Sequence, residues 1–170
     1  MKGPPQFNWL GISLFWIALL GLATLFFADK LAQQNNPNQH ITDLNSSPGQ
    51  AVILKRNRQG HYVAPGEING YPVLFLLDTG ATNIAIPEHI AEKISLKKGN
   101  KHAVMTANGA TTAYHTTLNN VSLGGITLHN ITASINPSMS FDKILLGMSF
   151  LKHLKLTQEG NTLTLSPPNH

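Results

Sequence analysis

The chain contains one long uncharged apolar stretch, then a polar stretch, and then short apolar runs separated by turn residues. Residues 9–27 read WLGISLFWIALLGLATLFF and contain no charged side chain. At about 1.5 Å per residue, this stretch is roughly 30 Å long as a helix, which is enough to cross the hydrocarbon core of a bilayer. We therefore predict a transmembrane helix over residues 9–27, preceded by an N-terminal tail over residues 1–8.

A cleaved signal peptide is the alternative interpretation of the same stretch. Signal peptides have an apolar core of about 7–15 residues, followed by a small-x-small cleavage site. The stretch here is longer, and the residues at 26–30 (FFADK) offer no good site, so the sequence favours an uncleaved anchor. Lys2 and the terminal amine favour a cytoplasmic N-terminus. We expect a single-pass protein of the inner membrane with its soluble domain in the periplasm.

Residues 28–50 read ADKLAQQNNPNQHITDLNSSPGQ and have few apolar side chains. Such a composition cannot bury enough apolar surface to form a core, so it predicts a flexible tether. A short helical continuation of the anchor at the start of this stretch is the alternative.

The remaining residues, 51–167, have the pattern of an all-β domain. They are dense in Val, Ile, Leu and Thr, and turn signals recur about every 8–12 residues. Turn residues at 69–70, 108–109, 124–125 and 159–161 each separate two apolar segments, which predicts four β-hairpins. Two short helices are expected, over Glu88–Ile94 with Pro87 in the first turn, and over Ser149–His153.

Two segments with a similar pattern suggest that the domain is built from two similar halves. Residues 73–80 (VLFLLDTG) form an apolar run that ends near a glycine and is followed by the helix at Pro87. Residues 143–154 (KILLGMSFLKHL) show the same order of apolar strand, glycine and helix. This order is consistent with pseudo-two-fold symmetry.

The composition excludes several kinds of chemistry. The chain has no cysteine, so disulfides, thiolate catalysis and cysteine-based zinc sites are excluded. Its histidines form no His-x-x-x-His pair and it contains no Gly-x-Ser-x-Gly, so we predict neither a metal site nor a serine hydrolase, and no cofactor. The net charge is +4, and the basic residues form only short groups without interleaved aromatic residues, so no nucleic-acid partner is expected.

Residues 76–81, LLDTGA, place a carboxylate at the end of an apolar run. Because Val73–Leu77 is continuously apolar, we expect this strand to be buried on both faces. A carboxylate there is costly unless it is hydrogen-bonded or partly protonated. Gly80 lets the backbone turn and direct N–H groups at the carboxylate of Asp78. The pattern suits an acid held at the floor of a cleft; the alternative is a turn that merely ends a strand.

Three motifs together carry a resemblance to a known family. Asp-Thr-Gly-Ala at 78–81 is followed by Ile-Leu-Leu-Gly at 144–147, and the Asn108-Gly109 hairpin lies between them. With the anchor, this order resembles the retropepsin-like (clan AA) aspartic proteases of the bacterial membrane-anchored type, which have a single Asp-Thr-Gly-Ala motif. The resemblance covers residues 51–167.

The resemblance implies an all-β, retropepsin-like acid protease barrel with one or two short helices, preceded by the transmembrane helix. It implies that Asp78 is catalytic and is supported by Thr79, Gly80 and Ala81. It further implies a flap, which would consist of Thr106, Ala107, Asn108, Gly109 and Ala110. It also implies that Leu145, Leu146 and Gly147 support the active site from the ψ-loop. Many members carry a charged or polar residue after the second glycine; here it is Met148.

The mechanism of that family needs two facing aspartates that share a proton. The chain has four aspartates, and only Asp78 is followed by Thr-Gly or Ser-Gly, whereas Asp142 is expected to be a surface-loop charge. We therefore predict a symmetric homodimer in which each chain contributes one Asp78. By the same resemblance, Ala51–Leu54 or Thr162–Leu165 would be interface strands.

These observations together predict a membrane-anchored aspartic endopeptidase that hydrolyses peptide bonds of a polypeptide substrate. The alternative is a non-catalytic peptide- or protein-binding module on the same fold.

Overall fold

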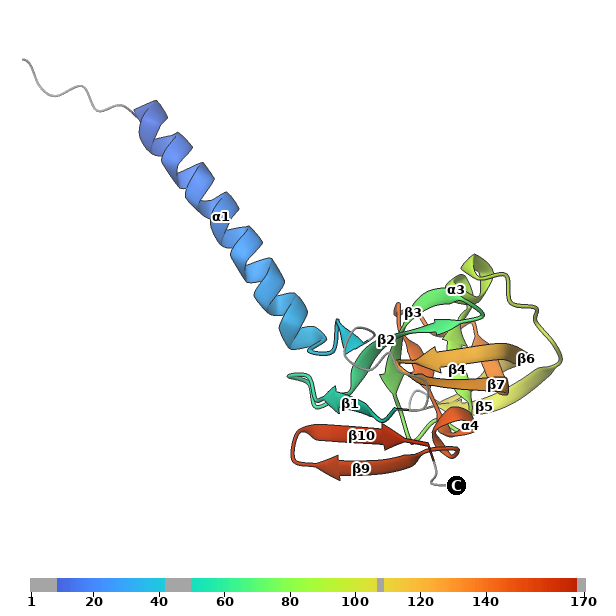
Figure 1. The fold of residues 1–170 in the computed structure, drawn as a ribbon. Helices are drawn as coiled ribbons and strands as arrows, with labels where there is room; N and C mark the ends of the chain where they lie inside the picture. The colour runs from blue at the N-terminus through green and yellow to red at the C-terminus, as the bar shows by residue number, and fades with distance from the viewer. Residues whose placement is uncertain (1–8, 42–49, 107–108, 168–170) are drawn as a thin grey trace, which may run out of the picture.

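A long N-terminal helix projects from a β-rich domain (Figure 1). The computed structural model describes residues 9–41, 50–106 and 109–167. In chain order the helices and strands are α1 (Trp9–Asn35), β1 (Val52–Lys55), β2 (Val63–Ile68), β3 (Tyr71–Leu77), β4 (Ile84–Pro87), α3 (Glu88–Lys93), β5 (Lys101–Thr106), β6 (Gly109–Leu123), β7 (Ile126–Asn136), β8 (Ile144–Leu146), α4 (Met148–Leu151), β9 (Lys155–Glu159) and β10 (Thr162–Ser166).

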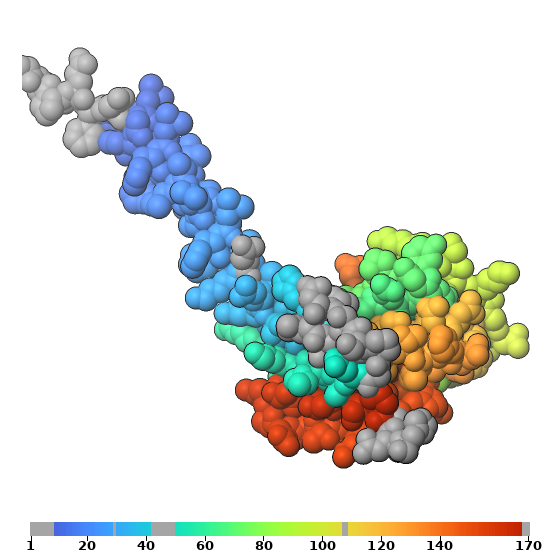
Figure 2. All heavy atoms as spheres, viewed as in Figure 1, coloured from blue at the N-terminus to red at the C-terminus, as the bar shows by residue number. Residues whose placement is uncertain are grey.

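Helix α1 is long and apolar enough to cross a membrane, as judged by its length and composition. Most of its large apolar side chains are exposed, and Figure 2 shows the helix standing clear of the domain along most of its length. A signal sequence near the N-terminus has the same properties. The helix continues to Asn35, so residues 28–35 of the stretch expected to be a tether are helical. Residues 42–49 of that stretch lie outside the described residues.

The predicted hairpins form. Strands β2 and β3 pair in antiparallel register across Asn69-Gly70, and both turn residues have positive φ (52° and 81°), as the tight turns of two-residue hairpins require. Strand pairs β6–β7 and β9–β10 form at the turns predicted at 124–125 and 159–161. Strands β5 and β6 also pair, but Gly109 is opposite Thr106 and so belongs to β6, not to a turn at 108–109; residues 107 and 108 lie outside the described residues. The short helices α3 and α4 also form, although Pro87 lies at the N-cap of α3 and not in its first turn.

Ten described strands are arranged in two sheets. The larger has the order β2-β3-β8-β4-β7-β6-β5, and β2 also pairs with β6, so this sheet closes on itself as a barrel. Strand β8 runs parallel to β3 and antiparallel to β4, while β4 runs parallel to β7. The smaller sheet has the order β1-β10-β9. The fold is therefore the all-β barrel that the sequence predicts. Strand β4, only four residues long, was not predicted.

Strand β3 differs from its prediction, because it is not buried on both faces. Only Phe75 is fully buried, and Val73, Leu74, Leu76 and Leu77 are partly exposed. Side chains alternate between the two faces of a strand. Val73 and Leu77 share the face of Phe75 and pack against the core, whereas Leu74 and Leu76 lie on the opposite face, which the described chain covers only in part. A continuous run of apolar residues therefore did not indicate how much of the β3 surface is buried within one chain.

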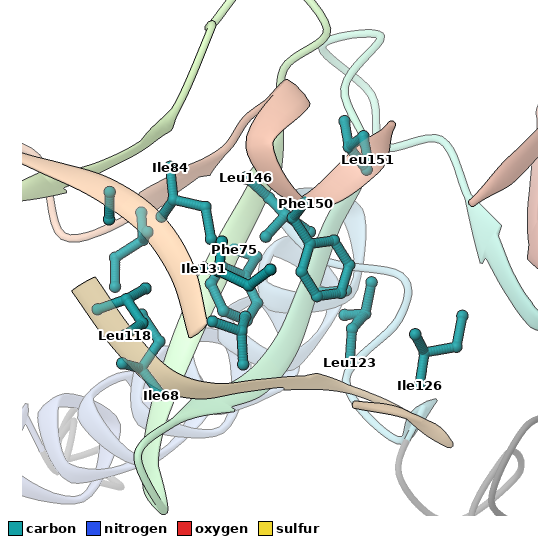
Figure 3. Close-up of a cluster of buried hydrophobic side chains, with 14 of the residues drawn as sticks. Ile68, Phe75, Ile84, Leu118, Leu123, Ile126, Ile131, Leu146, Phe150 and Leu151 are labelled. Carbon is teal, nitrogen blue, oxygen red and sulfur yellow. The ribbon is translucent and has the colours of Figure 1, made fainter. Parts of the chain in front are cut away.

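Buried side chains of the core pack β3 against β8 and against helix α4, which follows β8. Figure 3 shows Phe75 of β3, Leu146 of β8 and Phe150 of α4 in one cluster of buried side chains. All three side chains are fully buried. Full burial of one such side chain stabilises a fold by about 1.5–3 kcal/mol. This cluster holds α4 against the barrel and so fixes the position of the chain immediately after β8.

Phe150→Ala is expected to lower the free energy of unfolding by about 3–5 kcal/mol, because it removes a buried ring and leaves a cavity. Phe141 is 43% exposed and provides a matched control: Phe141→Ala is expected to change stability by no more than about 0.5 kcal/mol. Urea unfolding of the two variants measures the difference. Equal losses would show that the Phe75–Phe150 cluster does not hold the domain together.

Candidate active site

Asp78 lies where two parallel strands end together. Strands β3 and β8 pair over three residues, the last pair being Leu77 and Leu146. The backbone N–H of Asp78 then donates to the carbonyl oxygen of Leu146 at 3.2 Å. Asp78 therefore lies at the end of β3, beside the end of β8 and next to Gly147.

The turn after β3 holds the carboxylate through the backbone. The N–H of Gly80 donates to Oδ1 of Asp78 at 2.9 Å, and the N–H of Ala81 donates to the Asp78 carbonyl oxygen at 3.2 Å. A Cβ atom at Gly80 would lie 3.1 Å from Oδ1, so this residue approaches the carboxylate closely. The Asp78 side chain remains half-exposed, and Thr79 is exposed. The turn thus orients an acid that solvent and a ligand can still reach.

The segment after β8 is hydrogen-bonded to the same turn. The N–H groups of Met148 and Ser149 donate to the carbonyl oxygens of Ala81 (2.8 Å) and Thr82 (2.9 Å). In return, the buried hydroxyl of Ser149 accepts the N–H of Ile84 at 3.0 Å. The sequence reasoning missed this role of Ser149. The available signal was a small polar residue inside the apolar segment MSFL.

Gly147 makes this junction possible. A Cβ atom on Gly147 would lie 2.2 Å from the carbonyl oxygen of Asn83 and 2.6 Å from that of Ala81. Real Cβ atoms do not approach a backbone oxygen so closely. The glycine is therefore required by close packing of two backbone segments and not by an unusual φ, which is −90°. Leu145, Leu146 and Gly147 thus lie directly beneath the Asp78 turn.

The hairpin predicted as a flap ends in exposed residues. Thr106 pairs with Gly109, and its hydroxyl donates to the Gly109 carbonyl oxygen at 2.8 Å. Met105 is 82% exposed, and Ala110 opposite it is exposed too. Ala107 and Asn108 lie outside the described residues. The structure therefore brings the Asp78 turn and the β8 end together, and places the described flap residues at the solvent-exposed end of β5 and β6.

Asp142 is a surface charge. Its side chain is 91% exposed, and Oδ1 lies 2.9 Å from Nε2 of His89. The hydrogen bond that the Asp78 carboxylate makes within the described residues comes from a backbone N–H, not from a second carboxyl group. One chain, over its described residues, presents a single acid at the junction.

Two hollows on the described surface are lined by residues other than Asp78. The larger, about 610 Å³, lies along the 95–99 segment and His115, and the smaller, about 350 Å³, lies behind the Asp78 turn at Asn83 and Met148. Beside the larger hollow, the hydrogen bond with Glu88 raises the pKa of Lys98 above its ordinary value. No group of three His, Asp or Glu side chains that could hold a metal ion is found in 9–41, 50–106 or 109–167.

Comparisons with known proteins agree with this arrangement. Residues 64–153, which include both Asp78 and Gly147, match the family model described as gag-polyprotein putative aspartyl protease. A crystal structure of a retropepsin-like aspartic protease from Rickettsia conorii matches with a TM-score of 0.58 and 32% sequence identity, covering 69% of this chain and 91% of that chain.

Two curated relatives are also similar. One is an uncharacterised protein in the cobV 5′ region of Sinorhizobium sp, 36% identical over 135 residues, with 78% of this chain and 58% of the relative covered. The other is an uncharacterised protein of Rickettsia prowazekii (strain Madrid E), 32% identical over 107 residues, with 61% of this chain and 46% of the relative covered. The chain thus spans about half the length of the curated relatives it matches.

Gly147→Ala is expected to lower the free energy of unfolding by about 3 kcal/mol, because the new methyl group overlaps two backbone oxygens. Gly160→Ala is the comparison: it has open space but a φ of +56°, so a loss of about 1–2 kcal/mol is expected. Thermal or urea unfolding measures both. A Gly147→Ala variant as stable as the wild type would contradict the close approach of the two segments.

Proposed function

The chain belongs to the retropepsin-like aspartic protease family, and on that premise we propose that it is an aspartic endopeptidase whose active site is formed by the Asp78 carboxylates of two identical chains. The observation that carries the proposal is the position of Asp78: a half-exposed acid, oriented by the Gly80 N–H, at the junction of β3 and β8. A two-fold axis beside this junction would set two such turns against each other.

Two facing carboxylates cannot both be ionised, so they share one proton. The ionised carboxylate takes a proton from a water molecule, and the resulting nucleophile attacks the carbon of the scissile peptide bond. The protonated partner donates a hydrogen bond to the carbonyl oxygen, where negative charge develops. The peptide nitrogen then receives a proton as the C–N bond breaks. The cleft around the reaction would be completed by the second chain, which accords with the open surroundings of Asp78 in one chain.

The other site residues position this acid. Gly80 donates to its carboxylate, and Ala81 ties the turn to Met148. We assign Thr79 to the same turn, and Leu145, Leu146 and Gly147 to the floor beneath it. The hairpin containing residues 106–110 would fold over a bound polypeptide as a flap.

The dimer contacts are proposed to involve the smaller sheet. The two segments considered as interface strands pair with each other inside one chain, since Val52 is opposite Leu165. Strand β10 is hydrogen-bonded on both edges, to β1 and to β9, so it has no free edge for a partner. An added strand would have to join β1 or the exposed strand β9, or the sheets would pack through faces bearing Ile53, which is 53% exposed.

We further propose that residues 9–27 anchor the protein in the inner membrane, with the domain in the periplasm. Confinement to two dimensions raises the effective concentration of the chains and so favours pairing.

Asp78→Ala is expected to reduce peptide cleavage at least about a thousandfold, because it removes both the base and its protonated partner from the dimer. Asp142→Ala should leave cleavage within about twofold, because Asp142 is paired with His89 at the surface. A peptide-library cleavage assay on the purified full chain measures both, with unfolding curves confirming that the variants fold. Equal losses from the two changes would contradict the assignment, and peptide binding without cleavage by the wild type would favour the binding-module alternative.

A shared site also predicts how inactive chains affect active ones. If wild-type and Asp78→Ala chains exchange partners freely, the activity per wild-type chain should fall in proportion to the wild-type fraction, because mixed dimers carry one carboxylate. A matched titration with Asp142→Ala chains should cause no such fall. Activity per wild-type chain that stays constant in the Asp78→Ala mixture, with subunit exchange verified, would show that each chain works alone.

A further inference from the structure

The junction between α1 and the domain contains a buried polar side chain. Asn38 is 6% exposed. Its Nδ2 donates to the carbonyl oxygens of Lys55 (2.9 Å) and Val63 (2.7 Å), and its Oδ1 accepts the N–H of Lys55 at 2.7 Å. One side-chain amide therefore satisfies both backbone groups of Lys55, the last residue of β1, and also joins β1 to β2.

Neighbouring residues add contacts on both sides of Asn38. The N–H of Arg58 donates to the carbonyl oxygen of Gln34 at 3.2 Å, and Nδ2 of Asn57 donates to that of Asn35 at 3.0 Å. Ile41 is 3% exposed and belongs to the main hydrophobic core. In Figure 1 the C-terminal end of α1 meets the domain on the side of β1 and β2. The last turn of α1 and residues 36–41 are thus part of the folded domain.

This junction is too specific to be an incidental contact. Burying an amide is unfavourable unless its hydrogen-bonding groups are satisfied, and Asn38 uses both its oxygen and its nitrogen. The backbone groups that it binds would otherwise be left without partners in a partly buried place. A flexible tether, by contrast, needs no residue of this kind.

The docking changes how far the domain can move from a bilayer. A free 23-residue tether over residues 28–50 would have a root-mean-square reach of about 26 Å, and about 75 Å when fully extended. In the structure, a helix leads from the end of the apolar stretch at Phe27 to Asn35, a length of about 12 Å.

We propose that residues Gln34–Ile41 are a docking element that holds the domain at a fixed height above the membrane, so that its substrates are polypeptides attached to the same membrane and cut close to its surface. The substrate class rests on the proposed protease function and membrane anchor; the docking itself rests on the contacts of Asn38 and Ile41.

The test uses the full chain in lipid vesicles, with one cleavable peptide sequence presented at two heights. The peptide is attached to a membrane-spanning segment through a short or a long semi-rigid helical spacer, about 10 Å or 60 Å. The wild type is expected to cleave the short-spacer peptide at least about tenfold faster than the long-spacer one. Asn38→Ala should lower this ratio by at least about threefold, and Gln39→Ala, which removes the exposed amide of the next residue, should keep the wild-type ratio.

A second variant tests height without touching the docking contacts. An insertion of about ten Gly and Ser residues before Ala28 lengthens the connection to the bilayer and should raise cleavage of the long-spacer peptide. Equal cleavage of both peptides by the wild type, while the free peptide is also cleaved, would overturn the fixed height and leave the protease function intact.

Hydrogen exchange provides a readout that does not depend on activity. The Lys55 amide should be protected in the wild type and in Gln39→Ala, and should exchange at least about tenfold faster in Asn38→Ala. An unprotected Lys55 amide in the wild type would overturn the docking. If the wild type cleaves none of the peptides, including the free one in detergent, the proposed function and the substrate class fail together, and the exchange data alone decide the docking.

Discussion

The close approach of Gly147 to the carbonyl oxygens of Ala81 and Asn83 is the constraint on which the rest of the domain depends. It allows the segment after β8 to lie directly against the turn that carries Asp78. Three hydrogen bonds from Met148, Ser149 and Ile84 then join the two segments, and the ring of Phe150 continues the contact into the core. A side chain at position 147 would separate the acid from the layer that holds it.

The same junction explains why one chain presents an acid that is oriented but still partly exposed. The Gly80 N–H binds the carboxylate of Asp78, and the backbone of Asp78 is bonded to β8, while the residue remains partly exposed to solvent. Leu74 and Leu76 of β3, the strand that leads into Asp78, are likewise only partly buried in one chain. Both features follow if the fold supplies half of an active site and a second chain supplies the other half, which is the arrangement that we propose.

The connection to α1 places a second constraint on the domain. Asn38 satisfies both backbone groups of Lys55 at the end of β1, and Ile41 contributes to the core, so residues 38–41 are part of the folded domain. An edge strand with unpaired backbone groups invites pairing with other chains. Asn38 covers this edge at Lys55, the last residue of β1, whereas β9 at the other edge of the smaller sheet is exposed along its whole length.

The sequence by itself determined the elements whose signals are local. Alternating apolar runs and Asn-Gly or Gly-rich turns predicted the hairpins, and the 9–27 stretch predicted the long helix, because strand pairing across a short turn and helix length depend on neighbouring residues. The motifs at Asp78 and Gly147 were found for the same reason. Only the tertiary structure decided what depends on distant segments meeting: the roles of Ser149 and Asn38, the short strand β4, and the partial exposure of β3. The side-chain hydrogen bonds of Asn38 and Ser149 described above reach residues 17 to 65 positions away in sequence, so no local pattern encodes them.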